Sequence, residues 1–441
     1  MPFCRRQQPL DRTMLDRSKK PQTKPFGSLH LPEERCTLLH SGITFHELNH
    51  GNGQICKLSL IWNGGTSDVM PREALSLAMQ LIREGSPEIP PHIMDDMIDF
   101  NGASLSTQVS EHHSSMHLTC LTSRLEHLLP SIFDCITNPE MPENIIQANL
   151  RAAAERLTLA QNKVSYRVSR LNAARIMGSS HPDAQTPTVD SIMSLDRRTL
   201  LEVEQAICMS SAGLNVFLTG QISDKTRDIV LQNLERYTSK ANGTPYPISI
   251  IGYRTSSPGI EKITVDGSLQ SAVNISFPAI DRGHRDYIQL RLAVMALGGY
   301  FGSRLMSNIR EDKGYTYGIS SALMGALNGA YITIQSQQDH AYTDAVVEET
   351  MKEIERLRTE PMGKDELERL RAFAMSQLAA VLDTPFDISA YHSLRLTTGV
   401  PEGYFKSQQE IINNMTPQSI METAYCHINP AQARISIASP S

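Results

Sequence analysis

The feature of this sequence that most limits the folds open to it is an internal duplication. In the first half, the segment Ile136–Glu143 precedes a helical stretch that runs to about Gln161. In the second half, the segment Arg358–Asp365 precedes a similar stretch that runs to about Leu382. Self-similarity at this distance indicates that one supersecondary design occurs twice in the chain.

The order of the later elements repeats as well, because each half continues with a second helix and a returning strand. The pairs are a helix that ends near Met209 with the strand Leu214–Leu218, and a helix that ends near Cys426 with the strand Ala433–Ala438. Asp196 and Thr416 stand at corresponding places, where their side chains can cap the helix that follows.

Each half also begins with paired strands, Gly42–Trp62 and Lys262–Phe277. Strand pairs followed by helices and a returning strand are typical of α+β proteins. We therefore predict two homologous domains, each an antiparallel sheet with helices packed on one face. The predicted divisions are a flexible N-terminal arm (1–30), a first domain (31–238), a linker rich in Pro, Gly and Ser (239–260) and a second domain (261–441).

Composition excludes several classes of protein for this 441-residue chain. A formal net charge of −6 argues against a general nucleic-acid or membrane binder. The seven cysteines are scattered and lack C-x-x-C spacing, which fits a reducing compartment. The basic N-terminus has no apolar stretch of the secretory kind, and Asp11 and Asp16 are atypical of a mitochondrial transit peptide. We expect a cytoplasmic protein whose N-terminus is a flexible arm, or whose start lies downstream at Met14.

Two hydrogen-bond donors, Arg310 and Tyr317, flank a predicted break between a helix and a strand. Gly314 is the expected left-handed residue that ends the helix, and Tyr317 opens the strand-like run Tyr317–Leu323. A guanidinium and a phenol aimed at one point can stabilise a developing oxyanion. The spacing alone favours the alternative, a surface arginine and a half-buried strand tyrosine.

The segment Gly298–Ser320 (GGYFGSRLMSNIREDKGYTYGIS) resembles the second-domain signature of the insulinase/pitrilysin family, the inverted zincins. The resemblance extends from about Cys36 to Ala438 and is greatest for the short two-domain, processing-peptidase branch. It implies that Arg310 and Tyr317 hold peptide substrate and stabilise the tetrahedral intermediate. It also implies that the two domains form half of a clamshell around a peptide-sized chamber, so the chain requires a partner.

The zinc motif of that family, His-x-x-Glu-His on a helix of the first domain, is missing. Counting back from Gly85, the corresponding positions are Ser76, Leu77, Ala78, Met79 and Gln80. The family's third ligand is a glutamate on a later helix. There this chain offers Glu155, or Arg156 if the alignment slips by one position. We therefore expect no cofactor in this chain and zinc in its partner.

Two histidine-rich segments resemble metal sites. His46–His50 spells His-Glu-x-x-His, a motif that binds zinc only on a helix. Gly42 and Gly51 favour a strand instead, paired with Ile55–Trp62, on which the two histidines would lie about 13 Å apart.

A second cluster, Glu111–His117, is also strand-like. Met116, Leu118 and Cys120 form its apolar face, while Glu111, His113 and His117 form a polar face. Polar strand residues that line a cavity are the preferred interpretation, and a metal site is the alternative.

We therefore expect a non-zinc subunit of a heteromeric inverted-zincin peptidase, inactive alone. A zinc-bearing homologous subunit, or a second copy of the chain, would complete the peptidase, and Arg310 and Tyr317 would contact the peptide. The alternative is a catalytically silent scaffold or peptide-binding homologue, with Gly102–Val109 as a candidate sheet edge. An independent zinc peptidase that uses His46 and His50 is the third hypothesis.

Overall fold

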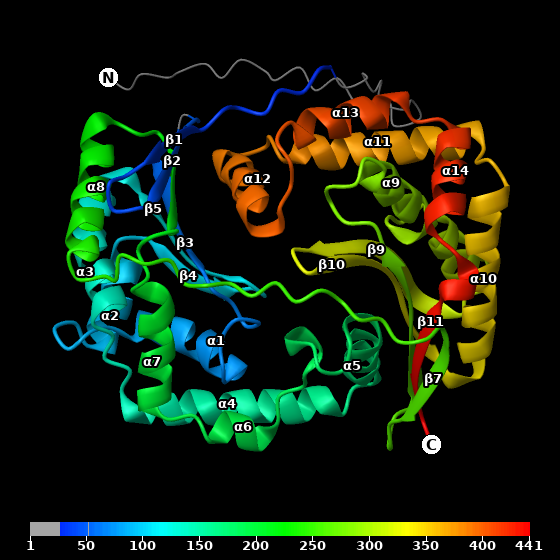
Figure 1. Ribbon diagram of the computed structural model, residues 1–441, viewed down its shortest axis with the longest axis horizontal. Coiled ribbons are helices and arrows are strands. Elements are labelled where there is room, and N and C mark those ends of the chain that lie inside the picture. Colours follow the sequence, from blue (N-terminus) through cyan, green and yellow to red (C-terminus); the bar gives the residue numbers. More distant parts are fainter. Residues whose placement is uncertain (1–26, 52) are drawn as a thin grey trace, which may run out of the picture. The chain divides into compact units, whose positions relative to one another are not determined.

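The computed structural model describes residues 27–51 and 53–441, so the predicted N-terminal arm lies almost wholly outside the described part. Residues Leu31–Ser441 form one compact unit. Within the described residues this unit contains a six-stranded and a five-stranded sheet, together with many helices (Figure 1). The predicted α+β class is confirmed. The second sheet begins at Gly259, inside the predicted linker 239–260, and two helices pack across the proposed division, as described below.

The first sheet has the strand order β1-β2-β6-β3-β5-β4. Its strands are β1 (Arg35–Leu38), β2 (Thr44–Asn49), β3 (Ile55–Asn63), β4 (Ser104–Val109), β5 (His113–Leu121) and β6 (Asn215–Gly220). The second sheet has the order β7-β11-β8-β10-β9. Its strands are β7 (Gly259–Thr264), β8 (Gln270–Ala279), β9 (Thr316–Ala326), β10 (Gly329–Asp339) and β11 (Arg434–Ser439).

The predicted pairing of the first strands is wrong in both halves. The returning strand β6 lies between β2 and β3, and β11 lies between β7 and β8. Val216, Phe217 and Leu218 of β6 are all buried, and a continuous apolar run is typical of a strand covered on both sides. The β2–β6 and β7–β11 pairs are parallel, so each sheet is mixed rather than wholly antiparallel.

The helices follow the predicted repeat. The first half contains α1 (Arg72–Leu81), α2 (Pro91–Phe100), α3 (Leu125–Thr137), α4 (Glu143–Gln161), α5 (Val164–Met177), α6 (Val189–Met193), α7 (Arg197–Cys208) and α8 (Asp224–Thr238). The second contains α9 (Tyr287–Gly298), a π-helix (Met306–Asp312), α10 (Thr343–Thr359), α11 (Lys364–Ala380), α12 (Pro385–Thr398), α13 (Tyr404–Asn414) and α14 (Pro417–His427). Asp196 and Thr416 accept hydrogen bonds from backbone N–H groups of α7 and α14, which confirms both predicted caps.

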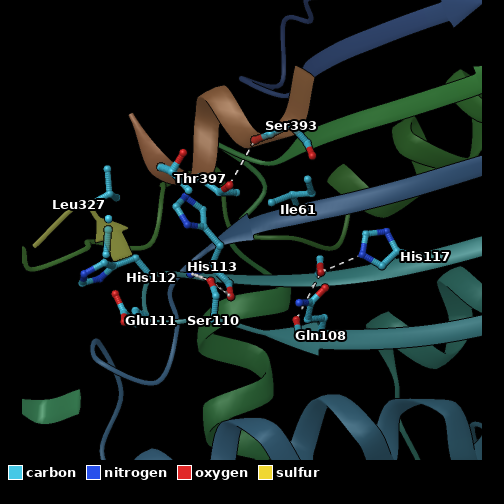
Figure 2. Close-up of a pocket in the computed structure, with 14 residues that line it drawn as sticks. Ile61, Gln108, Ser110, Glu111, His112, His113, His117, Leu327, Ser393 and Thr397 are labelled. Atoms are coloured by element: carbon cyan, nitrogen blue, oxygen red, sulfur yellow. Dashed lines mark hydrogen bonds between the residues drawn. The ribbon is translucent and has the colours of Figure 1, made fainter. Parts of the chain in front are cut away.

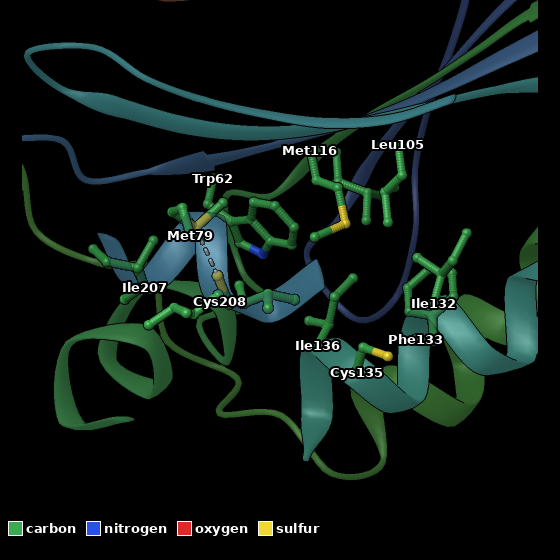
Figure 3. Packing of buried hydrophobic residues seen from close by; sticks show 14 of the residues in the cluster. Trp62, Met79, Leu105, Met116, Ile132, Phe133, Cys135, Ile136, Ile207 and Cys208 are labelled. Carbon is green, nitrogen blue, oxygen red and sulfur yellow. Dashed lines mark hydrogen bonds between the residues drawn. The ribbon is translucent and has the colours of Figure 1, made fainter. Parts of the chain in front are cut away.

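The core of the first half lies between its sheet and the helices α1, α3, α7 and α8. Figure 3 shows Trp62 and Met116 of the sheet facing Met79 of α1 and Ile132 of α3. Trp62 is 1% exposed, and its indole N–H donates to the hydroxyl of Tyr237 at 3.2 Å. The indole therefore buries its large apolar surface without leaving its donor unpaired.

Helices α5 and α12 are exchanged between the two halves. Helix α5 belongs to the first half of the chain, yet Val164 and Val168 pack against Val265, Ala272 and Ala438 of the second half. Helix α12 belongs to the second half and contacts β6 of the first sheet. Each sheet is thus covered in part by a helix from the other half.

Arg175 fastens α5 to the second sheet and should contribute measurably to stability. Its guanidinium donates to the carbonyls of Ile435 and Gly259, both at 2.8 Å, and to that of Ser257 at 3.3 Å. An Arg175→Met variant keeps the apolar stem and loses the donors, so we expect a loss of about 2 kcal/mol in the free energy of unfolding. Urea denaturation would measure this loss, with Arg167→Met, a change of an exposed residue on the same helix, as the control variant. Equal stabilities of the two variants would contradict the assignment.

Candidate functional site

Arg310 lies in the π-helix Met306–Asp312, a rare helical form that is frequent at functional sites. Ile309 is fully buried and fixes one side of this turn to the core. The neighbouring Arg310 is half-buried, and its Cζ lies 4.7 Å from the ring centroid of Phe301, within cation–π range. Phe301 is itself 63% exposed.

A polar network joins this π-helix to α10. The side-chain amide of Asn308 donates to Glu353 at 2.6 Å and to Glu349 at 3.3 Å. Lys313 forms an ion pair with Glu349 at 2.6 Å, and with Lys352 it lowers the pKa of Glu349 to about 2. The backbone on both sides of Arg310 is therefore held by α10.

The predicted break between helix and strand is confirmed. Gly314 has φ 67°, the left-handed conformation in which glycine is favoured, and β9 begins two residues later. Thr316 is buried, whereas Tyr317 is 92% exposed. Strand β9 is the edge of the second sheet and pairs only with β10 among the described strands. Tyr317 is therefore almost fully exposed. The alternative interpretation from the sequence, a half-buried strand tyrosine, is wrong.

The positions aligned with the zinc motif lie on α1 as predicted. Ser76 and Gln80 are exposed, while Met79 is fully buried with its Sδ 3.4 Å from Sγ of Cys208. The amide of Gln80 donates to the side-chain oxygen of Asn149 on α4 at 3.2 Å. Two neutral amides therefore meet where α1 approaches α4, and Glu155 is an exposed residue further along α4. The residues described by the structure contain no group of three or more His, Cys, Asp or Glu that could hold a metal ion.

His46 lies on strand β2 rather than on a helix, which confirms that prediction. The ring of His46 stacks on Phe217 with centroids 4.1 Å apart, and its Nε2 lies 3.2 Å from Oδ1 of Asn215. His50 follows the end of β2 and is exposed. His46 is thus a partnered residue of the sheet, and Glu47 is paired with Arg227.

The cluster Glu111–His117 lines a cavity of about 460 Å³, as its alternating polar face predicted (Figure 2). Burial lowers the pKa of both His113 and His117 to about 4, so each imidazole is neutral at pH 7. Burial also raises the pKa of Glu111, with the charge of Asp183 adding to the effect. Two neutral imidazoles, those of His113 and His117, therefore line this cavity.

The opposite wall of the cavity was not predicted. It consists of Gly325–Leu327, next to the β9–β10 turn, and of Ser393 and Thr397 on α12 (Figure 2). None of these residues belongs to a motif, and all lie more than 200 residues from His113 in the chain. Local patterns carry no signal for such a contact.

The chain is therefore a duplicated α+β protein that carries Arg310 on a π-helix, Tyr317 on the edge strand β9, and a buried methionine at position 79 of α1. Residues 208–373 match a family model described as the peptidase M16 inactive domain. M16 is the insulinase/pitrilysin group of peptidases, so the predicted resemblance is confirmed. No curated protein sequence matches the chain significantly.

Several solved structures share the fold over almost the whole chain. A peptidase M16 inactive domain from Pseudomonas fluorescens is 18% identical with a TM-score of 0.83, and the match covers 93% of this chain and 99% of that one. A protease from Helicobacter pylori is 13% identical with a TM-score of 0.83, covering 93% and 100%. The periplasmic protease PqqL from Escherichia coli is 14% identical with a TM-score of 0.78, and the match covers 96% of this chain but 47% of PqqL. At these identities the likeness shows a common fold.

Proposed function

We propose that this chain is a non-zinc subunit of a heteromeric M16-type peptidase, which contributes Arg310 and Tyr317 to the binding of peptide and to stabilisation of the tetrahedral intermediate. A partner subunit supplies zinc, its ligands and the general base. The division of labour is chemically sound, because oxyanion donors need not belong to the chain that carries the metal.

The observation that carries the proposal is the contrast between the two sites. The position of the missing base, Met79, is closed by packing against Cys208, whereas Tyr317 is 92% exposed and the half-buried Arg310 lies over the exposed ring of Phe301. Buried apolar packing at Met79 leaves no room for a general base at that position of α1. The two donors remain available to a substrate held by two subunits.

The coverage of PqqL supports a paired arrangement. This chain corresponds to about half of that protease, so a unit with two sheets can be one half of a larger peptidase. We propose a zinc-bearing homologous subunit as the other half, and a second copy of the chain as the alternative.

A reducing compartment such as the cytoplasm suits the six free cysteines among the described residues. No helix in the described part of the chain is long and apolar enough to cross a membrane.

The second candidate function is a catalytically silent peptide binder or scaffold. Strand β4 (Ser104–Val109) pairs only with β5 among the described strands, so the predicted sheet edge is present. An extended peptide can add to such an edge through main-chain hydrogen bonds, with no catalytic group required. Helix α1 also contacts β4, which places this edge beside the degenerate motif.

Metal analysis of the purified chain separates the zinc-peptidase hypothesis from the other two. We expect no stoichiometric zinc and no cleavage of unstructured peptides, because Ser76 and Gln80 stand at the ligand positions and His46 lies on a strand. Inductively coupled plasma mass spectrometry after dialysis measures the first, and a quenched-fluorescence peptide library the second. About one tightly bound zinc per chain, lost in His46→Ala, would overturn the expectation.

A further inference from the structure

The imidazole of His112 lies buried between two acceptors from different parts of the chain. His112 is 2% exposed, and its Nδ1 lies 3.0 Å and 3.1 Å from the two carboxylate oxygens of Asp68. Its Nε2 lies 2.6 Å from Oδ1 of Asn328, in the turn between β9 and β10. Asp68 follows β3 and His112 precedes β5, so the ring joins the end of the first sheet to a hairpin of the second.

The orientation of the Asn328 amide follows from its other neighbour. Nδ2 of Asn328 lies 3.3 Å from Oδ2 of Asp183, a carboxylate that also receives Ser67 and, at 3.4 Å, Arg72. A carboxylate accepts and does not donate, so the nitrogen of the amide must face Asp183 and its oxygen must face His112. Both ring nitrogens of His112 therefore meet acceptors, and both need a proton. The hydrogen-bond pattern requires an imidazolium.

The surrounding charges agree with this assignment. Burial by itself lowers the pKa of His112, but hydrogen bonds to Asp68 and Asn328 and the charges of Asp68 and Glu111 outweigh it, so the pKa is raised above 6.5. The remaining titratable neighbours of the network are His113, His181, Asp183, Arg72, Arg170, Tyr246, Tyr253 and Tyr331. The positive charge of His112 also contributes to the low pKa of His113.

We propose that His112, held as an imidazolium between Asp68 and Asn328, is a pH-sensitive latch that fixes the β9–β10 turn against the first sheet and closes one wall of the cavity lined by His113 and Leu327. The linker belongs to the same latch, because the backbone N–H of Ser249 donates to Asp68 at 2.9 Å. A neutral imidazole carries a hydrogen on only one of its two ring nitrogens. If Nε2 loses the proton, its lone pair faces the oxygen of Asn328, and if Nδ1 loses it, its lone pair faces the carboxylate of Asp68. In either case the contact becomes repulsive.

The direction of the pH effect follows from the raised pKa. A group whose pKa is higher in the closed state stabilises that state fully below its open-state value, near 6.5, and this stabilisation is lost as pH rises to the closed-state value. Over that interval the opening equilibrium of the turn should increase about tenfold per pH unit and then become constant.

Two measurements on the full chain test the latch. In a histidine ¹⁵N spectrum at pH 6.5, both ring nitrogens of His112 should carry protons, and the signal should be assigned by its loss in His112→Gln. Hydrogen exchange of the amides from 325 to 330 and from 246 to 251, corrected for intrinsic rates, should increase together between pH 6.5 and 9, while β2 stays protected. A neutral His112 tautomer at pH 6.5, or hydrogen exchange of these amides that does not depend on pH, would overturn the proposal. Either result can be obtained from the wild-type protein without a variant.

Two variants of the turn provide a matched comparison. Asn328→Leu removes one acceptor, so the turn should open at lower pH than in the wild type. Leu327→Ala loosens the same turn without touching the hydrogen bonds, so exchange should be faster at every pH with an unchanged pH profile. Identical pH profiles for Asn328→Leu and Leu327→Ala would exclude the latch.

Discussion

Replacement of Glu204 by leucine should stabilise the protein by about 5 kcal/mol at pH 8 and by much less at pH 4. Glu204 lies on α7 at 0% exposure, and within the described residues its carboxyl group has no hydrogen-bond partner other than the thiol of Cys208. Burial raises its pKa from 4.5 to about 8, although the nearby thiol of Cys208 opposes the rise. A difference of about 3.5 pH units at about 1.36 kcal/mol each gives this magnitude.

The sign of the pH dependence is fixed by linkage. Because the folded state holds this proton more tightly than the unfolded state, the contribution of Glu204 is most favourable below pH 4.5 and is lost as pH rises to about 8. Urea denaturation at several pH values should show this slope in the wild type and not in Glu204→Leu. Glu202→Leu, an exposed change on the same helix, is the control and should keep the wild-type slope. A Glu204→Leu variant that retains the slope would show that another group causes it.

Loss of either donor at the proposed substrate site should lower kcat of the assembled peptidase on the order of 100-fold, the usual effect of one oxyanion donor. Arg310→Lys keeps the charge and loses the planar fork, and Tyr317→Phe keeps the ring and loses the hydroxyl. The loss should fall on kcat more than on KM, because the interaction strengthens as negative charge develops. Steady-state kinetics of the complex with the zinc-bearing partner measure both constants.

Assembly with the partner should survive both substitutions, since Tyr317 is exposed and Arg310 contacts Phe301 at the surface. Size-exclusion chromatography of the mixed subunits checks this point. Arg285→Lys, a change of another exposed arginine of the second half, serves as a control for general charge effects. Full activity of Arg310→Lys and Tyr317→Phe would make the pair structural and favour the scaffold function.

The elements of the fold could be predicted because their signals are local. Asp196 and Thr416 cap helices that repeat across the two halves, and the capping side chains lie within three residues of the groups they bind. Gly314 predicted the turn ahead of Tyr317 because left-handed backbone favours glycine. The alternation of Glu111, His113 and His117 with apolar residues predicted the polar wall of the cavity.

The pairing of those elements could not be predicted, because it depends on segments far apart in the chain. The glycines around His50 predicted a hairpin, but β6 pairs with both neighbours and separates them. The π-helix around Arg310 depends on Asn308 reaching Glu349 and Glu353 of α10, some 40 residues later. One of the two acceptors of His112, Asn328, is 216 residues away, and no local pattern identifies it as a partner.

The reciprocal placement of α5 and α12 has a consequence for how the two halves relate. A chain cut within residues 239–260 would not give two autonomous modules, because each fragment would lack a helix that covers its sheet and would expose the apolar residues beneath it. The fragments should recover native structure only when mixed. In a domain-swapped homodimer, two copies exchange the same element. Joining two such copies head to tail in a single gene would produce the exchange of helices seen between the two halves of this chain.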